Sequence, residues 1–408
     1  MTYAPPVAEI DARRSRLLIA AVVGFVACGA GFALDPNHFF RAWLVAYMLF
    51  LGIALGSLAL MMIQHLSGGN WGVFRRIFEA SSRTLPLLAI LFLPVLVPVL
   101  LGTSSLYVWD HPEHVAADHI LQLKSPYLNP PFFAIRAVFY FAGWIALSMV
   151  LNKLSARQDS GEVGVNRTIQ RVSGFGLVFY ALTVTFAGID WIMSLNPHWY
   201  STLFGFLMIG GQGLSALAFT IVAATLLVKT QPMASLLKPY HFHDLGKLTF
   251  AFVMLWAYFN FSQYLLTYAA NLVEEIPYMI VRTTHGWEWV AVFLVVFHFV
   301  APWLLLLSRN LKRTPHRLVV IAVWLLIAKY VDYYMMIAPE FDGATGANLH
   351  MLEGEHVSHF FVHWLDLAAP LAIGGIWLWM FFSELRKRPM LAYGDPYLRE
   401  SLAGGGGH

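Results

Sequence analysis

Residues 316–338 read HRLVVIAVWLLIAKYVDYYMMIA. This stretch is long enough to cross a bilayer, because a transmembrane α-helix needs about 20 predominantly apolar residues. Lys329 and Asp332 nevertheless lie inside it, three positions apart and therefore on one side of a helix. A charge at membrane depth costs roughly 2.5 kcal/mol or more, so such side chains turn inward to a partner or to water. The stretch predicts a transmembrane helix that buries an ion pair inside a bundle.

The rest of the chain has the same character. Of its 408 residues, 58% are hydrophobic and 12% are charged, whereas soluble proteins have about a quarter of their residues charged. We therefore predict an all-α integral membrane protein. Its ten predicted spans are 17–34, 41–64, 84–102, 132–152, 172–194, 202–228, 246–270, 288–308, 316–338 and 357–382, with tails 1–16 and 383–408. No small-residue cleavage site follows the first span, so we expect it to be retained.

The basic residues of the loops alternate between the two sides of the membrane. If both termini share one side, 21 of the 26 Lys and Arg residues lie on that side. The opposite loops have only Arg41, Lys124 and Arg282 as basic residues, and they carry many acids. The positive-inside rule then predicts two cytoplasmic termini and an even number of spans.

The fifth and ninth spans end in similar sequences. GIDWIMSLNPHW (188–199) and YVDYYMMIAPEF (330–341) share the pattern D-[WY]-x-M-x-[LI]-x-P-x-[WF]. We predict two repeats, 39–194 and 198–338, each a four-helix bundle, related by a pseudo-two-fold axis along the membrane normal. The stretches 17–34 and 357–382 are then extra helices outside the repeats. The alternative to a true repeat is chance similarity between two apolar sequences.

Charged residues in the predicted spans gather in the half away from the termini. By the helical rise, Asp332 lies about 7 Å and Asp366 about 6 Å from the middle of the membrane. The set comprises three acids and two cations: Asp190, Asp332, Asp366, Arg136 and Lys329. We expect Arg136 to pair with Asp190, and Lys329 to serve both other acids, with His363 nearby. The acid left without a full partner can exchange protons, and the alternative is purely structural pairing.

Other polar residues extend this set. His243 and Asp244, in YHFHDLGKLTF (240–250), are predicted to lie at the cytoplasmic mouth of the seventh span. They could form an entrance for protons, or they could simply be the solvated start of a helix. Asn260, Gln263 and Tyr333 could line a quinone site or serve only for packing. A haem needs two axial ligands at matched depth, and the sequence offers no such pair of histidines near the middle of the spans. His359 and His363 lack a third metal ligand, so no metal site is expected. The single cysteine, Cys28, excludes an intrachain disulfide, a c-type haem attachment and an iron–sulfur cluster ligated by this chain alone.

Four stretches carry a resemblance to a known family. They are IQHLSGGNWG (63–72), FAGIDWIMSLNPHWYSTLFG (186–205), HFHDLGKLTFAFVMLW (241–256) and HWLDLAAPLAIGGIWLW (363–379). Together with the ten-span plan they resemble the polysulfide-reductase-like (NrfD-like) membrane subunits. The chain is most similar to the smaller of the two such subunits in alternative complex III, a bacterial quinol:electron-acceptor oxidoreductase.

The resemblance implies a subunit of the bacterial inner membrane that carries no redox centre of its own. Its partners would be a paralogous NrfD-like subunit, lipids, and iron–sulfur and cytochrome c subunits that hold the iron–sulfur clusters and haem c, with no nucleic acid. It also implies a proton pathway, for which the matching positions are Asp190, Lys329, Asp332, His363 and Asp366, with His243 and Asp244 at the inner mouth. The alternatives are a quinol-binding subunit that forms part of the oxidation site and a membrane scaffold for peripheral redox subunits.

Overall fold

The computed structural model describes residues 5–352 and 357–403, and most of this part of the chain is helical. No β-strand forms among these residues, apart from one isolated bridge between Phe341 and Asn348. The all-α prediction is therefore confirmed. The outermost residues of the two predicted tails, 1–4 and 404–408, lie outside the described residues.

Eight long helices form the frame of the molecule: α1 (Val7–Leu34), α2 (Pro36–Ser67), α8 (Pro130–Asp159), α9 (Val165–Trp191), α10 (Phe204–Leu227), α12 (Pro239–Ala270), α17 (Pro315–Ile337) and α18 (Leu365–Leu385). Four of them begin with proline, which suits the first position of a helix because its N–H needs no partner there. Two interrupted segments run beside them. One consists of α3 (Arg75–Ser82), α4 (Leu85–Leu91) and α5 (Leu93–Leu101), and the other of α14 (Trp287–Phe293), a π-helical turn (Leu294–Val300) and α15 (Ala301–Leu307).

Nine segments of the described chain are long and apolar enough to cross a membrane. They are Val7–Leu34, Pro36–Ser67, Trp71–Leu101, Pro130–Asp159, Val165–Leu195, Phe204–Leu227, Trp287–Leu307, Pro315–Glu340 and Leu365–Leu385. The stretch predicted as the seventh span forms α12, a helix of 32 residues that is not among the nine. The membrane class of the protein follows from these helices, and the count of ten stays a prediction.

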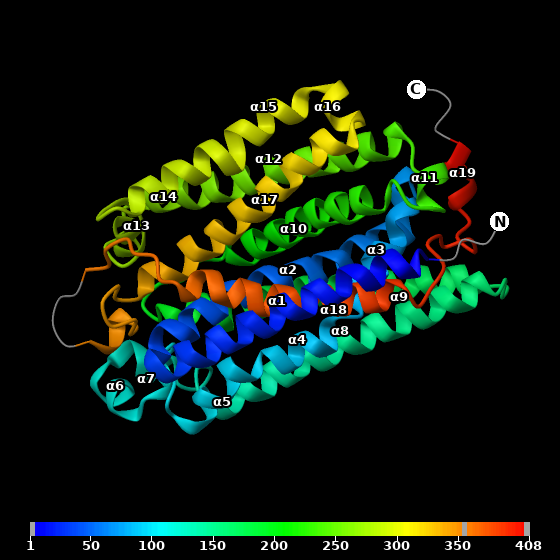
Figure 1. The fold of residues 1–408 in the computed structure, drawn as a ribbon. Coiled ribbons are helices and arrows are strands. Elements are labelled where there is room, and N and C mark those ends of the chain that lie inside the picture. The colour runs from blue at the N-terminus through cyan, green and yellow to red at the C-terminus, as the bar shows by residue number, and fades with distance from the viewer. Residues whose placement is uncertain (1–4, 353–356, 404–408) are drawn as a thin grey trace.

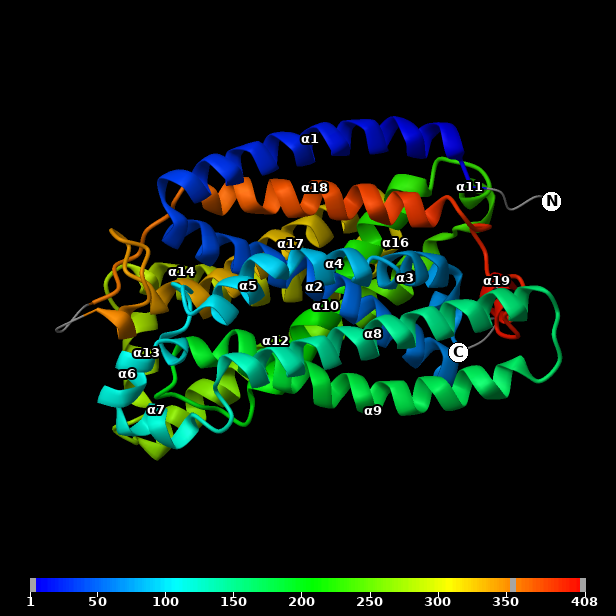
Figure 2. The same ribbon diagram turned by 90° about the horizontal axis from the view of Figure 1, so that it is seen from below.

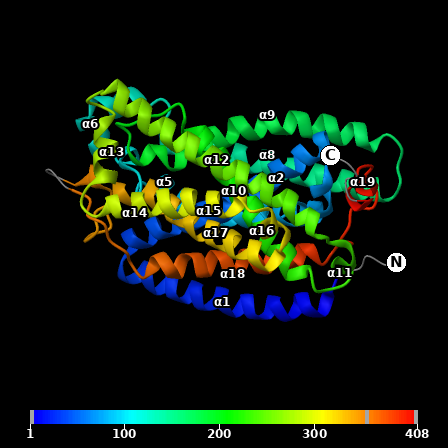
Figure 3. The same cartoon turned by 90° about the horizontal axis from the view of Figure 1, so that it is seen from above.

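Two almost wholly buried helices, α2 and α10, pack against each other at the centre of the molecule. The segments α3–α5, α8 and α9 form a group beside α2, whereas α12, α14, α15 and α17 form a group beside α10. The helices α1 and α18 lie side by side along one face, opposite α9 (Figures 2 and 3). Much of the outer surface of α1 is apolar and exposed, for example Ile19 and Val26, as expected for a helix that faces lipid.

The short elements divide between the two ends of the bundle (Figure 1). One end, called the loop-rich end below, carries α6 (Pro112–Ala117), α7 (His119–Lys124) and α13 (Ile276–Thr283). The other, called the basic end, carries α11 (Met233–Leu236), α16 (Arg309–Arg313), α19 (Leu398–Ala403) and the start of α1. Most loops that contain Lys and Arg therefore lie together at one end of the molecule, as the charge pattern predicts.

Several predicted boundaries were wrong. Helix α1 begins at Val7, within the predicted tail, and α2 begins at Pro36, which places Arg41 in the second turn of a helix instead of at the predicted edge of its span. The third span starts earlier than predicted and is broken after Leu91, beside Pro94. The last span begins only at Leu365, so His359 and His363 lie in an irregular segment and do not share a helical face.

A close approach of two backbones holds α1 against α18. A Cβ added at Gly24 would lie 2.4 Å from the backbone nitrogen of Ala372, and one added at Gly375 would lie 2.7 Å from that of Ala21. Gly24→Val should therefore push the helices apart and cost about 1–3 kcal/mol, seen as a lower melting temperature of the detergent-solubilised protein. Gly29→Val is the control, because no atom lies within 4 Å of that position. Equal melting temperatures for the two variants would contradict the packing.

Candidate functional site

The ion pair predicted between Lys329 and Asp332 is present in the structure. Lys329 Nζ lies 2.5 Å from Asp332 Oδ2, and both side chains are buried in the same face of α17. The indole N–H of Trp256, from α12, also donates to Asp332 Oδ2 over 3.1 Å. A Cβ at Gly211 of α10 would lie only 2.3 Å from Lys329 Nζ, so the glycine makes room for the ammonium group.

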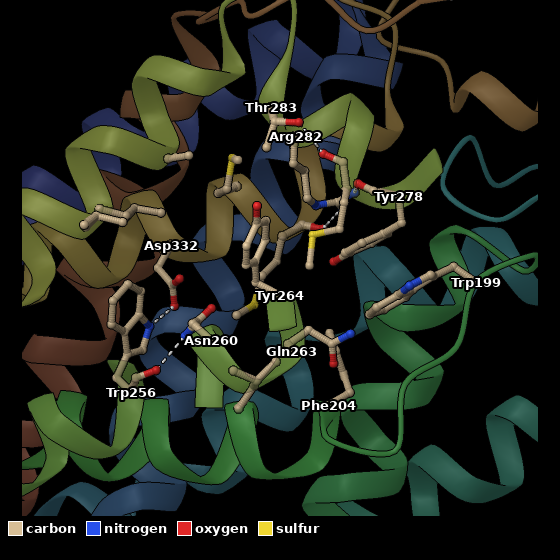
Figure 4. Close-up of a pocket in the computed structure, with 17 residues that line it drawn as sticks. Trp199, Phe204, Trp256, Asn260, Gln263, Tyr264, Tyr278, Arg282, Thr283 and Asp332 are labelled. Atoms are coloured by element: carbon tan, nitrogen blue, oxygen red, sulfur yellow. Dashed lines mark hydrogen bonds between the residues drawn. The ribbon is translucent and has the colours of Figure 1, made fainter. Parts of the chain in front are cut away.

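Asp332 also faces a cavity of about 200 Å³ between α10, α12, α13, α14 and α17 (Figure 4). The cavity is mainly aromatic and aliphatic. Its labelled lining residues are Trp199, Phe204, Trp256, Asn260, Gln263, Tyr264, Tyr278, Arg282, Thr283 and Asp332. A volume of this size has room for several water molecules.

Two of the predicted quinone-site residues line this cavity and the third does not. Asn260 Nδ2 donates to the Trp256 carbonyl oxygen over 2.9 Å, and Gln263 Oε1 accepts from the Ser201 hydroxyl. Tyr333 points elsewhere, because it follows Asp332 on the helix and so faces about 100° away. Its hydroxyl lies against Gly52 of α2 and has no hydrogen-bond partner among the described residues.

Asp366 does not share Lys329, which corrects the sequence prediction. Arg41 Nη2 instead binds both of its carboxylate oxygens over 2.8 and 2.9 Å. The backbone N–H of His363 donates to the same carboxylate over 2.9 Å, and Tyr334 accepts from Arg41 over 3.2 Å. Because α2 starts earlier than predicted, its arginine lies at the depth of Asp366. Each acid therefore has its own cation, and the predicted surplus acid does not exist.

Asp190 is paired as predicted. Arg136 Nε and Nη2, from α8, donate to its two oxygens over 2.8 and 3.0 Å, and the Tyr140 hydroxyl donates over 2.9 Å. The guanidinium carbon of Arg136 also lies 3.9 Å from the ring centre of Tyr127. Three donors in fixed positions satisfy this carboxylate, and the interaction joins α8 to α9.

His298 is the unexpected member of the site. It lies in the π-helical turn, is fully buried, and neither ring nitrogen has a hydrogen-bond partner among the described residues. Its ring centre lies 4.2 Å from that of Trp256, the residue that donates to Asp332. π-helical turns often occur at functional sites. Nothing in the sequence beyond its place in the eighth predicted span marks His298, because no sequence pattern predicts the π turn.

The residues of the predicted cytoplasmic mouth lie far from this cavity. Asp244 Oδ1 is 3.1 Å from Lys247 Nζ and 3.9 Å from His243 Nδ1, at the start of α12. Along the helix axis they are about 18 Å from Trp256. They lie at the basic end as predicted, and the structure does not bring them together with Asp332.

A buried network at the basic end was missed by sequence reasoning. Glu79 is fully buried and accepts from Arg75 Nε over 3.0 Å, Arg76 Nη1 over 2.5 Å and the Ser155 hydroxyl over 2.5 Å. Arg75 also reaches Asp395, near the C-terminus, over 3.2 Å. The sequence RRIFE (75–79) carries the signal, since both arginines lie three or four residues before the glutamate. The predicted spans 41–64 and 84–102, however, leave these residues in a loop.

No protein-family model matches the chain, and no curated protein is significantly similar to it in sequence. The NrfD-like resemblance therefore stays a prediction.

The Arg41–Asp366 pair provides a test of structural ion pairing. Arg41→Leu should destabilise the protein by about 3–5 kcal/mol, because it leaves a buried carboxylate without its cation, and the double variant Arg41→Leu/Asp366→Leu should recover most of this loss. Thermal unfolding in detergent measures both. Arg386→Leu is the control, because its ion pair with Asp11 is exposed and should matter little. A double variant as unstable as the single one would contradict this account.

Proposed function

We propose that the chain is a membrane subunit of a bacterial quinol:electron-acceptor oxidoreductase resembling alternative complex III, and that it handles protons through the Lys329–Asp332 pair. Quinol oxidation releases two protons and two electrons. The electrons would pass to haem c and iron–sulfur clusters in partner subunits, while this chain would provide a path for protons. A paralogous NrfD-like subunit would lie beside it in the plasma membrane.

The observation that carries the proposal is the identity of the cation beside each buried acid. Asp190 and Asp366 are each bound by an arginine, whose guanidinium group does not lose its proton in proteins. Asp332 is bound by a lysine, which can become neutral when buried. Of these three pairs, it is therefore the one in which both members can change protonation.

The surroundings of Asp332 favour proton exchange as well. On one side lies the cavity, which can hold water, and on another lies Trp256, which packs against the ring of His298. Neither nitrogen of that ring has a hydrogen-bond partner among the described residues. A proton can move between a carboxylate, an imidazole and ordered water without any large motion of the helices. We propose that Lys329, Asp332 and His298 form the central part of the route.

The proposal includes a membrane topology. We place α12 as the tenth span, because it is 32 residues long and packs between α10 and α15. With ten spans the basic end, where α1 begins and α19 lies, faces the cytoplasm. The helix groups beside α2 and α10 would then be the two related four-helix bundles.

Asp332→Asn tests the proton pathway. The amide still accepts from Trp256 and Lys329 but cannot carry a proton, so the complex should assemble while quinol turnover or proton release falls. Both are measured on the purified complex in liposomes with a pH-sensitive dye. Asp190→Asn is the matched control, because this carboxylate is also buried in the bundle but is held by Arg136 and Tyr140. Normal proton release and turnover in Asp332→Asn would exclude the proposed route.

A second candidate function is quinol binding in the same cavity. The cavity combines aromatic walls with a carboxylate, two amides and Arg282, and such a combination suits a ring that carries two hydroxyl groups. A quinol there would give its protons directly to Asp332.

Asn260→Leu distinguishes this candidate. If quinol binds in the cavity, the variant should raise the KM for quinol several-fold, because it removes a polar group that faces the ligand. Gln212→Leu is the control, since Gln212 is buried in α10 and accepts from Tyr180. An unchanged KM in Asn260→Leu, measured by steady-state quinol oxidation, would count against the second function and leave the first intact.

A further inference from the structure

Three side chains with metal-binding atoms meet at the loop-rich end, where α1 passes into α2. Asp35 caps α2, His38 lies in its first turn, and His363 precedes α18. One ligand atom from each residue lies within 4.8 Å of the other two. The two imidazole rings are stacked, with their centres 4.4 Å apart and their planes 24° apart. The sequence could not reveal this group, because α18 and α2 are brought together only by the fold.

The contacts of His38 fix its orientation. Its Nε2 lies 3.3 Å from the carbonyl oxygen of Gly343, which can only accept, so Nε2 donates there in the tautomer that leaves Nδ1 free to bind an ion. Its Nδ1 lies 2.7 Å from Asp35 Oδ2, which is a hydrogen-bond distance, so a bound ion replaces the shared proton once the two atoms move apart. Histidines that bind a metal typically donate their other ring N–H to a backbone carbonyl or carboxylate. His38 has this arrangement.

His363 adds a second imidazole, with its Nε2 4.0 Å from Asp35 Oδ2. The N–H of Leu365 reaches His363 Nδ1 only at 3.5 Å. This contact is at the limit of hydrogen bonding, so the ring proton can move from Nε2 to Nδ1 at little cost.

We propose that Asp35, His38 and His363 form a binding site for a divalent transition metal ion such as Zn²⁺. Two imidazoles and one carboxylate leave a fourth, open position for water, and imidazole ligands favour Zn²⁺, Cu²⁺ and Ni²⁺ over Mg²⁺ and Ca²⁺. Ligand atoms around a tetrahedral Zn²⁺ ion lie about 3.3 Å apart. The 2.7 Å and 4.0 Å separations from Asp35 Oδ2 must therefore each change by about 0.6–0.7 Å, and the two stacked rings must turn so that both nitrogens face the ion. The Asp35 side chain is 33% exposed and can adjust to this change.

The metal ion joins two parts of the fold that also position Asp366. The backbone N–H of His363 donates to the Asp366 carboxylate, so an ion bound to the ring fixes the same turn. Asn37 Nδ2 donates to the carbonyl oxygen of Thr345, in the loop that covers His38. The site does not depend on whether the chain handles protons or quinol.

The test is a metal titration of the full-length protein in its purified complex. The complex is first treated with a chelator and then titrated with Zn²⁺ against a fluorescent competitor. The variants are His363→Gln and Asp35→Asn, of which the second retains a side chain that can cap α2. The matched control is His359→Gln, in the same segment, whose ring contacts His285. Co²⁺ added to the same proteins reports the coordination geometry by its visible absorption.

The wild type and His359→Gln should bind one Zn²⁺ ion tightly and show the intense absorption of tetrahedral Co²⁺. In His363→Gln and Asp35→Asn the affinity should fall by more than the roughly 10–100-fold that loss of an outer-shell partner costs. X-ray absorption of the zinc-loaded wild type should show two imidazole nitrogens, and this measurement needs no variant to fold. The absence of a stoichiometric site in the wild type, equal affinity in all four proteins, or fewer than two imidazoles on the zinc would overturn the proposal.

Discussion

The cost of placing a charge in a low-dielectric interior governs how this protein is built. An ion pair with one partner removed costs several kcal/mol, because the remaining charge has no water to replace its partner. Asp366 is therefore matched by Arg41 across α18 and α2, and Asp190 by Arg136 across α9 and α8. Because each guanidinium makes two directed hydrogen bonds, these pairs fix which helices are neighbours and at what height. They supply directional contacts between helices whose remaining interface is apolar and lies in an apolar solvent.

The Lys329–Asp332 pair follows a different logic. Both residues belong to α17, so their pairing joins no two helices, and only the Trp256 indole links the carboxylate to α12. Cohesion alone does not require such a pair, because replacing a buried ion pair with well-packed hydrophobic residues is often neutral or stabilising. Lysine is also the cation whose protonation state responds most readily to burial. The position of the pair beside the cavity is what our proposal of proton exchange rests on.

Sequence reasoning succeeded where a local pattern carries the information. Helical spacing predicted the Lys329–Asp332 pair, and matched depth on successive spans predicted Arg136 with Asp190. It failed for Asp366, because α2 begins five residues earlier than predicted. The prediction therefore placed Arg41 at the edge of its span, among the outer charges, and left it out of the count of buried cations. It also failed for the network around Glu79, since the arginines of α3 had been counted as loop charges. Long-range partners depend on the exact ends of helices, which hydropathy leaves uncertain by several residues.

The features that depart from an apolar, regular membrane helix are concentrated around one cavity. Asn260 and Gln263 lower the apolar content of α12, which among the eight long helices of the described chain is the one not apolar enough to count as a membrane span. The π-helical turn interrupts the regular hydrogen bonding of the neighbouring segment and turns His298 toward Trp256. A lysine and an aspartate interrupt the apolar surface of α17. Each feature costs stability in a membrane, and local rules tend to be broken where function requires it. Their convergence on a single cavity, rather than their scatter over the bundle, is the strongest reason to place the function there.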